Sequence, residues 1–305
     1  MKMITFLNKI ITVVLPYVPK FIVKIFANKY IAGTSTKDAI NTIKKINSFN
    51  LKATADILGE HTTDISESEE ITSDYINLIN EIYNNKLDCN ISLKLSHIGY
   101  EINLNTMNKN IKKIHDAAIN TNNFIRLDME DNKTTDNNIA TYLNEKERSN
   151  HIGIVFQAYL KRTYNDIKKL ENNSNIRICK GIYIESEQIA YKNADEINKN
   201  FLEILKLALS KNIFVGIATH DEMLIDKCID LIQKMNISSD NFEFQALYGV
   251  PINNIIKKIK KHNYNLRIYV PYGKDWYKYS IRRLKENPNV AKYILSNIFK
   301  KSIYN

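Results

Sequence analysis

Eight short β-rich runs recur along the chain between residues 51 and 270, and helix-like segments separate them. The runs begin near residues 51, 91, 124, 152, 176, 213, 242 and 266, so successive starts are 24 to 40 residues apart. The intervals, for example 106–120 and 196–210, carry apolar residues at three-four spacing. Strands that alternate with helices form a parallel sheet through right-handed crossovers. Eight such units are what a closed (β/α)8 barrel requires, so the sequence predicts an α/β fold of the TIM-barrel type.

The chain length fits one such barrel with an N-terminal extension. A single α/β barrel can reach 305 residues, and no linker or low-complexity tract marks a second domain. No glycine-rich phosphate fingerprint follows an early strand, which argues against a Rossmann domain. We therefore expect a helical extension over residues 1–50, including a polar helix at 36–48, and the barrel over residues 51–305.

The first 30 residues are apolar and basic, but their pattern is not that of a membrane span. Asn8 and Lys9 interrupt the apolar run and Pro16 ends it, whereas a transmembrane helix needs about 18 or more apolar residues in a row. No cleavage site of a secretory signal follows promptly. We expect two short basic amphipathic helices, which either cover the bottom of the barrel or lie on a membrane surface.

Charge and cysteine content narrow the partners and the compartment. Lys and Arg outnumber Asp and Glu by 43 to 33, and the net charge of +10 favours anionic partners such as nucleic acid, acidic lipid or a phosphorylated cofactor. The lysines are scattered and no nucleic-acid motif is present, so we expect no nucleic-acid partner. Cys89, Cys179 and Cys228 form no CxxC pair and no disulfide framework, which predicts a reducing, cytoplasmic location and gives no sign of a metal site.

Polar side chains gather where the predicted strands end. Lys94 and Asp128 each alternate with apolar neighbours, so they lie on the strand face opposite those neighbours. Each polar residue alone has a structural explanation, such as an interior ion pair or a strand-end hydrogen bond. Together they are too many for stability alone, because buried charges are costly unless they are paired or used. The other members of this group are Gln157, Arg177, Lys180, Thr219, His220 and Gln245.

The last predicted strand is followed by a turn and a helix. Residues 266–270 alternate β-branched and aromatic side chains, and Pro271 and Gly273 then break the run. A helix-permissive segment follows from Trp276 to Asn287.

Two adjacent arginines lie on this predicted helix. Glu286 is four residues from Arg282 and three from Arg283, so one carboxylate can brace both guanidiniums. The plain explanation is a solvated arginine pair. The functional explanation is that a small carboxylate ligand draws both guanidiniums inward, since each offers a planar fork that fits a carboxylate.

Six segments, in their order and spacing, resemble the bacterial monofunctional proline dehydrogenases over roughly Tyr30 to Ala291. The resemblance implies a distorted (β/α)8 barrel with noncovalent FAD. It implies oxidation of L-proline to Δ1-pyrroline-5-carboxylate by hydride transfer to flavin N5, the first step of proline catabolism. It further implies a membrane quinone as electron acceptor and, since the chain ends at Asn305, a separate Δ1-pyrroline-5-carboxylate dehydrogenase. The segments are FIRLDMED, IGIVFQAYLKRT, RICKGIYIE, ATHD, FEFQALYGV and RIYVPYGKDWYKYSIRRLKENPNVA.

The same resemblance implies a role for each matching residue. Asp128 and Arg177 are the implied catalytic residues: Asp128 pairs with Lys94, and Arg177 lies beside flavin N5, where its charge stabilises the reduced flavin. Tyr269 crowds the proline ring, and in the family a smaller residue there goes with hydroxyproline use. The implied substrate-binding residues are Lys94, Tyr269, Arg282, Arg283 and Glu286, and the implied flavin contacts are Met129, Gln157, Arg177, Cys179, Lys180, Gly181, Thr219 and His220.

Some residues depart from the family pattern, and other functions stay open. Ile178, Cys179 and Ile182 stand where the family usually has Leu, Val and Ala, and Lys278 stands where proline is usual. These departures bear on cofactor affinity, pocket width and the start of the helix. The alternatives are a hydroxyproline dehydrogenase, a Schiff-base aldolase on the same barrel with Lys180 as nucleophile, and a non-enzymatic basic barrel that binds nucleic acid or lipid.

Overall fold

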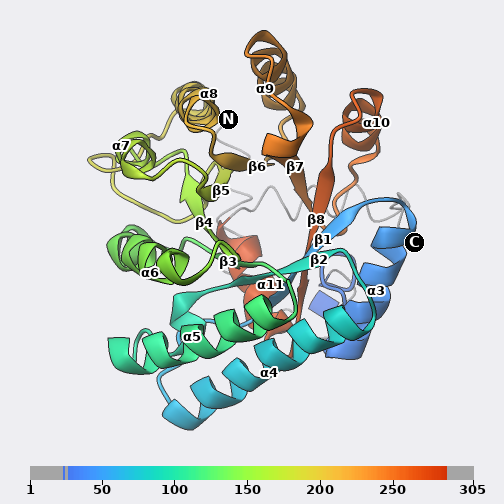
Figure 1. The fold of residues 1–305 in the computed structure, drawn as a ribbon, viewed down its shortest axis with the longest axis vertical. Helices are drawn as coiled ribbons and strands as arrows, with labels where there is room; N and C mark the ends of the chain where they lie inside the picture. Colours follow the sequence, from blue (N-terminus) through green and yellow to red (C-terminus); the bar gives the residue numbers. More distant parts are fainter. Residues whose placement is uncertain (1–22, 25–26, 287–305) are drawn as a thin grey trace.

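A closed barrel of parallel strands forms the centre of the molecule (Figure 1). The structure is a computed structural model that describes residues 23–24 and 27–286, with side chains described as far as residue 281. Within these residues eight strands pair in chain order, and β8 pairs with β1 to close the ring, which confirms the predicted (β/α)8 barrel. The strands are β1 (Lys52–Ile57), β2 (Cys89–Leu93), β3 (Ile125–Leu127), β4 (Ile152–Gln157), β5 (Asn175–Cys179), β6 (Phe214–Ala218), β7 (Phe242–Leu247) and β8 (Leu266–Tyr272).

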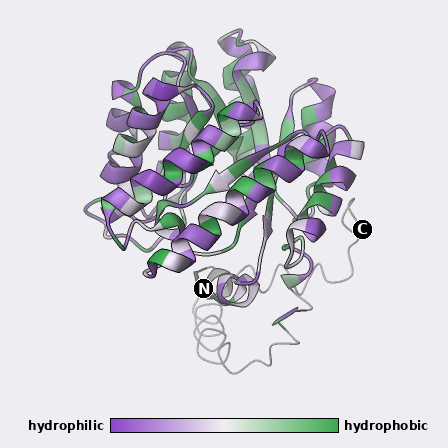
Figure 2. Cartoon of the chain, turned by 60° about the horizontal axis from the view of Figure 1, so that its bottom comes forward, coloured by the Kyte–Doolittle hydropathy of each residue, from purple (hydrophilic) through white to green (hydrophobic). Residues whose placement is uncertain are grey.

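Helices surround the barrel and turn their polar faces outward (Figures 1 and 2). Their apolar faces join the outward-facing strand residues in one core, as Ile43 of α3 and Leu78 of α4 illustrate. The polar helix predicted at 36–48 is confirmed. The helices are α3 (Thr36–Ser48), α4 (Ile65–Asn84), α5 (Leu104–Asn120), α6 (Thr135–Arg148), α7 (Thr163–Lys169), α8 (Ala194–Ser210), α9 (Glu222–Lys234), α10 (Asn253–Lys261) and α11 (Trp276–Glu286).

Asparagines end several of these helices. Asn50, Asn122, Asn212, Asn236 and Asn263 follow α3, α5, α8, α9 and α10, and all have a positive φ between 51° and 56°. Asparagine tolerates this left-handed conformation better than most residues, so it can reverse the chain after a helix without glycine. These five asparagines thus serve the turns that lead from their helices towards the next strand.

The interior of the barrel is polar. Arg126 and Gln245 point into it from β3 and β7, and both are buried. Two glycines make room for them: a Cβ on Gly153 would lie 2.8 Å from Arg126 Nη1, and a Cβ on Gly216 would lie 2.4 Å from Gln245 Nε2. Other buried polar residues on the strands are Thr54, Asp56, Asn90, Ser92, Gln157, Arg177, Glu243 and Arg267.

Strand β8 is longer than the sequence predicts. Pro271 was expected to break the strand, but β8 continues through it to Tyr272, in register with β1. The carbonyl groups explain this, because Pro271 O accepts from Ala32 N at 2.9 Å and Tyr272 O accepts from Leu58 N at 2.7 Å. A proline lacks only the N–H, so it can still accept in the ladder. The break comes at Gly273, which has φ +138°.

The stretch before α3 lies along the carboxyl-end rim of the barrel. Gly273 N donates to Gly33 O at 3.1 Å, and Ala27 and Ile31 pack against Leu58, which follows β1. Whether the segment before these residues covers the bottom of the barrel or lies on a membrane surface stays a prediction. The two helices predicted before residue 23 lie outside the described residues, and the division at residue 50 stays a prediction. No helix in the described ranges is long and apolar enough to cross a membrane.

Candidate active site

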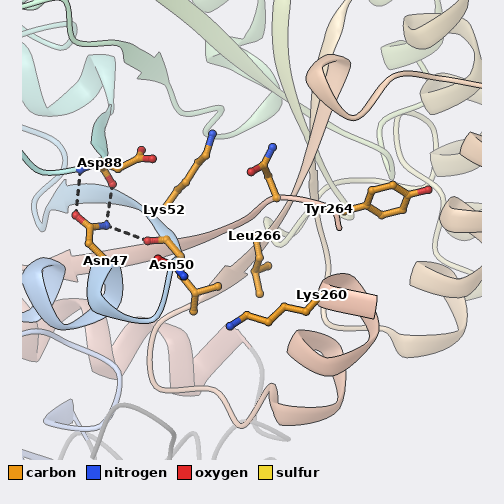
Figure 3. A pocket seen from close by; sticks show the side chains of 9 residues that line it. Asn47, Asn50, Lys52, Asp88, Lys260, Tyr264 and Leu266 are labelled. Atoms are coloured by element: carbon orange, nitrogen blue, oxygen red, sulfur yellow. Dashed lines mark hydrogen bonds between the residues drawn. The ribbon is translucent and has the colours of Figure 1, made fainter. Parts of the chain in front are cut away.

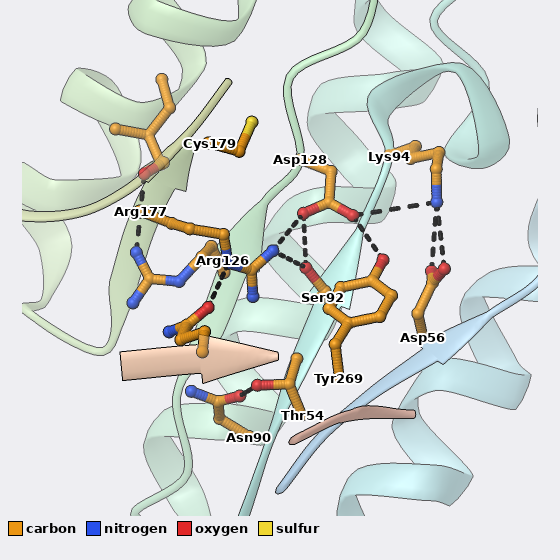
Figure 4. A network of polar contacts seen from close by, with 12 residues as sticks. Thr54, Asp56, Asn90, Ser92, Lys94, Arg126, Asp128, Arg177, Cys179 and Tyr269 are labelled. Carbon is orange, nitrogen blue, oxygen red and sulfur yellow. Dashed lines mark hydrogen bonds and ion pairs between the residues drawn. The ribbon is translucent and has the colours of Figure 1, made fainter. Parts of the chain in front are cut away.

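A buried carboxylate is the centre of a polar cluster at the carboxyl ends of the strands (Figure 4). Asp128 follows β3 directly and accepts hydrogen bonds from Ser92 Oγ at 2.6 Å, Tyr269 OH at 2.7 Å and Arg177 Nη1 at 2.9 Å. Burial raises the pKa of Asp128, but the charges of Arg177 and Lys94 outweigh it and hold this pKa below its usual value. Asp128 is therefore a fixed anion between two cations, and its contact with Lys94 is the interior ion pair that the sequence offered as one explanation of these residues.

Lys94 has a closer partner than the one expected. Its Nζ donates to both carboxylate oxygens of Asp56 at 3.2 Å and lies 3.8 Å from Asp128 Oδ2. Burial lowers the pKa of Lys94, but Asp56 and the other acidic neighbours hold it well above its usual value. Lys94 is thus an ammonium shared by two carboxylates. Sequence reasoning missed Asp56, although it stands two residues after Thr54 on the same face of a β-rich run.

Arg177 on β5 is held at two of its three nitrogens. Nε donates to Gln245 Oε1 at 2.6 Å, Nη1 donates to Asp128, and the guanidinium carbon lies 5.1 Å from the centre of the Tyr269 ring. The third nitrogen, Nη2, is buried and has no hydrogen-bond partner among the described residues. A buried donor is costly when unsatisfied, so this nitrogen suits an acceptor atom of a bound molecule.

The residues predicted to contact the flavin lie at or near the carboxyl ends of strands β3 to β6. Gln157, the last residue of β4, donates to Glu130 O at 2.9 Å, and His220 Nε2 accepts from Leu247 N at 3.0 Å. Burial lowers the pKa of His220 to about 4, so its ring is neutral near pH 7. The other predicted contacts on this rim are Met129, Arg177, Cys179, Lys180, Gly181 and Thr219.

Two of these residues have local contacts that explain their positions. Lys180 Nζ forms an ion pair of 2.7 Å with Asp221 Oδ2. Gly181 has φ +106°, and a Cβ there would lie 2.1 Å from the Tyr159 ring. Only glycine fits this combination of left-handed backbone and close packing. The chain after β5 therefore packs closely against Tyr159.

The arginine pair belongs to α11. Figure 1 shows this helix over the centre of the barrel, inside the ring that the outer helices form. Arg282, Arg283 and Glu286 belong to α11, but their side chains lie outside the described part of the chain. Upstream on the helix, Trp276 and Tyr279 pack against the cluster of Ala27, Ile31 and Leu58 on the rim. The start of the predicted helix at Trp276 is confirmed, and Asn287, its predicted end, is not among the described residues.

Further buried residues of the cluster were not predicted. Ser92 bonds Asp128, and Glu130 accepts from Ser96 N at 3.2 Å and also from Ser96 Oγ. Glu243 accepts from both Gln245 and Arg267 in the barrel interior. Their alternation with apolar residues in ISLKL, LDMED and FEFQAL is the signal that could have identified them.

A cavity lies at the end of the barrel opposite the polar cluster (Figure 3). It has a volume of about 370 Å³ at the amino ends of β1 and β8. Asn47 there donates to Leu51 O at 2.9 Å and Asp88 O at 3.1 Å, so its amide fastens the end of α3 to the start of β2. We assign this cavity no function. Among the described residues, no His, Cys, Asp and Glu group could hold a metal ion.

Comparisons with known proteins agree with the geometry. A family model described as proline dehydrogenase matches residues 39–294. Proline dehydrogenase 2 of Bacillus subtilis is 33% identical over 279 residues, 91% of this chain and 92% of that protein. Proline dehydrogenase of Deinococcus radiodurans is 31% identical over 280 residues, 90% of each chain.

A solved structure has the same fold. Proline utilization A from Bdellovibrio bacteriovorus superposes with a TM-score of 0.78 at 23% identity, over 91% of this chain. The chain spans about a third of the length of that protein, 33%. This likeness therefore concerns the barrel alone.

Proposed function

The chain belongs to the proline dehydrogenase family, and we propose that it oxidises L-proline to Δ1-pyrroline-5-carboxylate by hydride transfer to N5 of a noncovalently bound FAD. The observation that carries the proposal is the cluster of Asp128, Arg177, Lys94 and Tyr269 at the carboxyl ends of a closed barrel. Active sites of this fold lie at that end. This cluster combines fixed charges with a buried hydrogen-bond donor, Arg177 Nη2, that has no partner among the described residues. Such groups suit the binding of a small zwitterion.

The residues present fit a flavin. Arg177 Nη2 is a buried donor without a partner among the described residues, and Gly181 follows the carboxyl end of β5, the strand that carries Arg177. A bound flavin supplies the two-electron acceptor, while the protein supplies binding, orientation and electrostatics. We propose Met129, Gln157, Cys179, Lys180, Gly181, Thr219 and His220 as its contacts, together with Arg177, whose charge offsets the negative charge of the reduced cofactor.

The other residues are proposed to hold the substrate. Arg282 and Arg283 bind the proline carboxylate as planar forks, with Glu286 bracing them. Lys94 and Tyr269 border the ring, and Asp128 fixes both of them through its contacts of 3.8 and 2.7 Å. Holding donor and acceptor in a near-attack geometry can supply roughly 7–11 kcal/mol of the barrier.

We propose a quinone of the cytoplasmic membrane as the electron acceptor and a separate Δ1-pyrroline-5-carboxylate dehydrogenase as the next enzyme. A cytoplasmic protein that reduces a membrane quinone has to visit the bilayer surface. The basic, apolar residues 1–30 are suited to such peripheral contact. The alternative is that they only pack on the body of the protein.

The alternative enzyme activities differ in what supports them. A hydroxyproline dehydrogenase would use the same cluster, and the bulk of Tyr269 beside the site favours the unsubstituted ring. An aldolase would need Lys180 as a free amine, but its Nζ is paired with Asp221 at 2.7 Å, and a paired ammonium is not a nucleophile. The ion pair therefore favours the dehydrogenase.

An absorption spectrum tests the proposal. The purified protein is expected to show the flavin bands, and anaerobic addition of L-proline is expected to bleach them. Lys180→Met serves as the control for the aldolase, because it removes the only nucleophile which that activity would use. A colourless protein that borohydride traps with a carbonyl substrate, in a manner lost in Lys180→Met, would overturn the proposal in favour of the aldolase.

A further inference from the structure

A chain of buried polar groups runs through the barrel interior from β8 to Arg177. Arg267 Nε donates to Glu243 Oε1 at 2.6 Å, and Gln245 Nε2 donates to the same oxygen at 2.8 Å. Gln245 Oε1 then accepts from Arg177 Nε at 2.6 Å. All four residues are buried, and none of the first three is in the set predicted to contact substrate or cofactor. The chain therefore connects the barrel interior to Arg177, whose Nη2 has no hydrogen-bond partner among the described residues.

The chemistry of these groups fixes the orientation of the Gln245 amide. A carboxylate only accepts hydrogen bonds, and an arginine Nε only donates. Glu243 therefore requires the NH2 group of Gln245, which leaves the amide oxygen for Arg177. A reversed amide would set NH2 against N–H and oxygen against carboxylate. One carboxylate thus determines which atom faces Arg177.

Two further observations show that the chain is built into the fold. Gly216 on the neighbouring strand β6 leaves the space that Gln245 fills, since a Cβ there would lie 2.4 Å from Gln245 Nε2. Burial raises the pKa of Glu243, but Arg267 outweighs it through charge and hydrogen bond and holds this pKa below its usual value. Glu243 is thus ionised, as the amide orientation requires, and its buried charge is balanced by Arg267.

We propose that Glu243 is a positioning residue, which acts through Gln245 to fix the Arg177 guanidinium so that Nη2 faces the reducible edge of the cofactor. Asp128 holds Nη1 and Gln245 holds Nε, so the guanidinium plane cannot rotate. The part of this inference that concerns the cofactor rests on the proposed function. The part that concerns Arg177 does not, and the two can be measured separately.

The test uses a double variant with matched controls. Glu243→Leu with Arg267→Met removes both members of this ion pair together, so neither is left buried without the other. Glu243→Gln keeps an acceptor for Gln245. Thr54→Val is the packing control. Thr54 Oγ1 donates to Asn90 Oδ1 in the same interior, and this hydrogen bond is not part of the chain of polar groups that leads to Arg177.

The first readout is hydrogen exchange of the Arg177 Nε–H in the purified protein, measured by NMR and assigned by its loss in Arg177→Lys. We expect slow exchange in the wild type, Glu243→Gln and Thr54→Val. In the double variant we expect exchange at least about tenfold faster, as follows from losing a hydrogen bond to a charged group. Equal protection in the double variant would overturn the inference, whatever the protein does with proline.

The second readout concerns the cofactor. In the double variant the reduction potential of the bound flavin should become more negative and kcat should fall at least about tenfold, with KM for proline unchanged. Faster Nε–H exchange with an unchanged potential would overturn the cofactor part. If the purified protein holds no flavin, the proposed function fails, while the exchange data still decide the positioning of Arg177. If the double variant does not fold, Gln245→Leu, which removes no charge, replaces it under the same criteria.

Discussion

The Tyr269 hydroxyl donates to Asp128 at 2.7 Å, while the face of the same ring lies 5.1 Å from the Arg177 guanidinium. One aromatic side chain therefore contacts both opposite charges of the cluster. A hydrogen bond at its tip and a cation–π contact on its face fix the ring in position. Tyr269 is thus a rigid wall of the site, and its bulk has a predictable effect on which substrates fit.

Replacing Tyr269 should separate the effect of ring bulk from that of the hydroxyl. Tyr269→Ser should lower kcat/KM for proline and raise the relative activity towards trans-4-hydroxyproline, because space opens beside the substrate ring. Tyr269→Phe keeps the bulk and should leave the ratio of the two substrates nearly unchanged. Steady-state kinetics with both substrates check this. The same ratio in all three proteins would assign the selectivity to another residue.

Asp128→Asn should destabilise the protein strongly. The substitution keeps the shape but removes the charge that pairs with Arg177 at 2.9 Å and Lys94 at 3.8 Å. Breaking a buried pair on one side costs roughly 3–5 kcal/mol. Here Arg177 loses its carboxylate partner, while Lys94 keeps Asp56 at 3.2 Å. Ser92→Ala removes one neutral donor and should cost only about 1 kcal/mol. Urea unfolding gives both values, and equal costs would show that the charge of Asp128 is unimportant for stability.

Acid should weaken the fold through two buried histidines, His220 and His97, since burial lowers the pKa of both, that of His97 to about 3. Burial lowers the pKa of His220 to about 4 from an ordinary 6.5, so the folded protein binds a proton here less readily than the unfolded chain. The stability from a lowered pKa is full above about 6.5 and is lost as the pH falls towards about 4. His220→Gln should flatten this part of the profile of unfolding free energy against pH. An unchanged slope between these values would contradict the burial of a neutral ring.

The barrel and much of its cluster could be predicted from the sequence because both depend on local alternation. Lys94 and Asp128 stand out as charged residues among apolar ones, and the eight runs have regular spacing. The hydrogen-bond and ion-pair partners of these residues could not be predicted in this way. Asp56 on β1 is a closer partner of Lys94, which follows β2, than Asp128 is. Glu243 is connected to Arg177 only through Gln245. Such pairings depend on strand register and tilt, which local patterns do not encode.

Pro271 shows the same limit in the backbone. The sequence predicts a break because proline lacks an N–H. This lack weakens a strand only where a neighbouring carbonyl needs that N–H as a donor. Here Ala32, far away in the sequence, donates to the Pro271 carbonyl at 2.9 Å and lets β8 continue. Only the tertiary structure supplies that neighbour.

Arg282→Ala and Arg283→Ala should each lower kcat/KM for proline by roughly 10- to 150-fold. In the proposed role, each arginine donates a charged hydrogen bond to the substrate carboxylate, and the loss of such a bond costs roughly 1.5–3 kcal/mol. Lys278→Ala, on the same helix, is the control, because its side chain is 84% exposed and contacts only Asp275 among the described residues, at 3.5 Å. Wild-type kcat/KM in both arginine variants would show that another group holds the carboxylate.

Removal of residues 1–25 should separate membrane contact from catalysis. The cut leaves Ala27 and Ile31, which pack against Leu58 on the rim, so the site should keep its support. If the segment docks on membranes, the intact protein should bind anionic vesicles at low salt, with about 1 kcal/mol per lysine near the surface. Salt should screen this binding, the truncated protein should lack it, and proline-dependent reduction of a soluble dye should survive. A full-length variant with Lys2, Lys9 and Lys20 changed to Gln serves as the charge control and should bind more weakly. Loss of flavin or aggregation on truncation, with no vesicle binding by the intact protein, would instead make the segment structural.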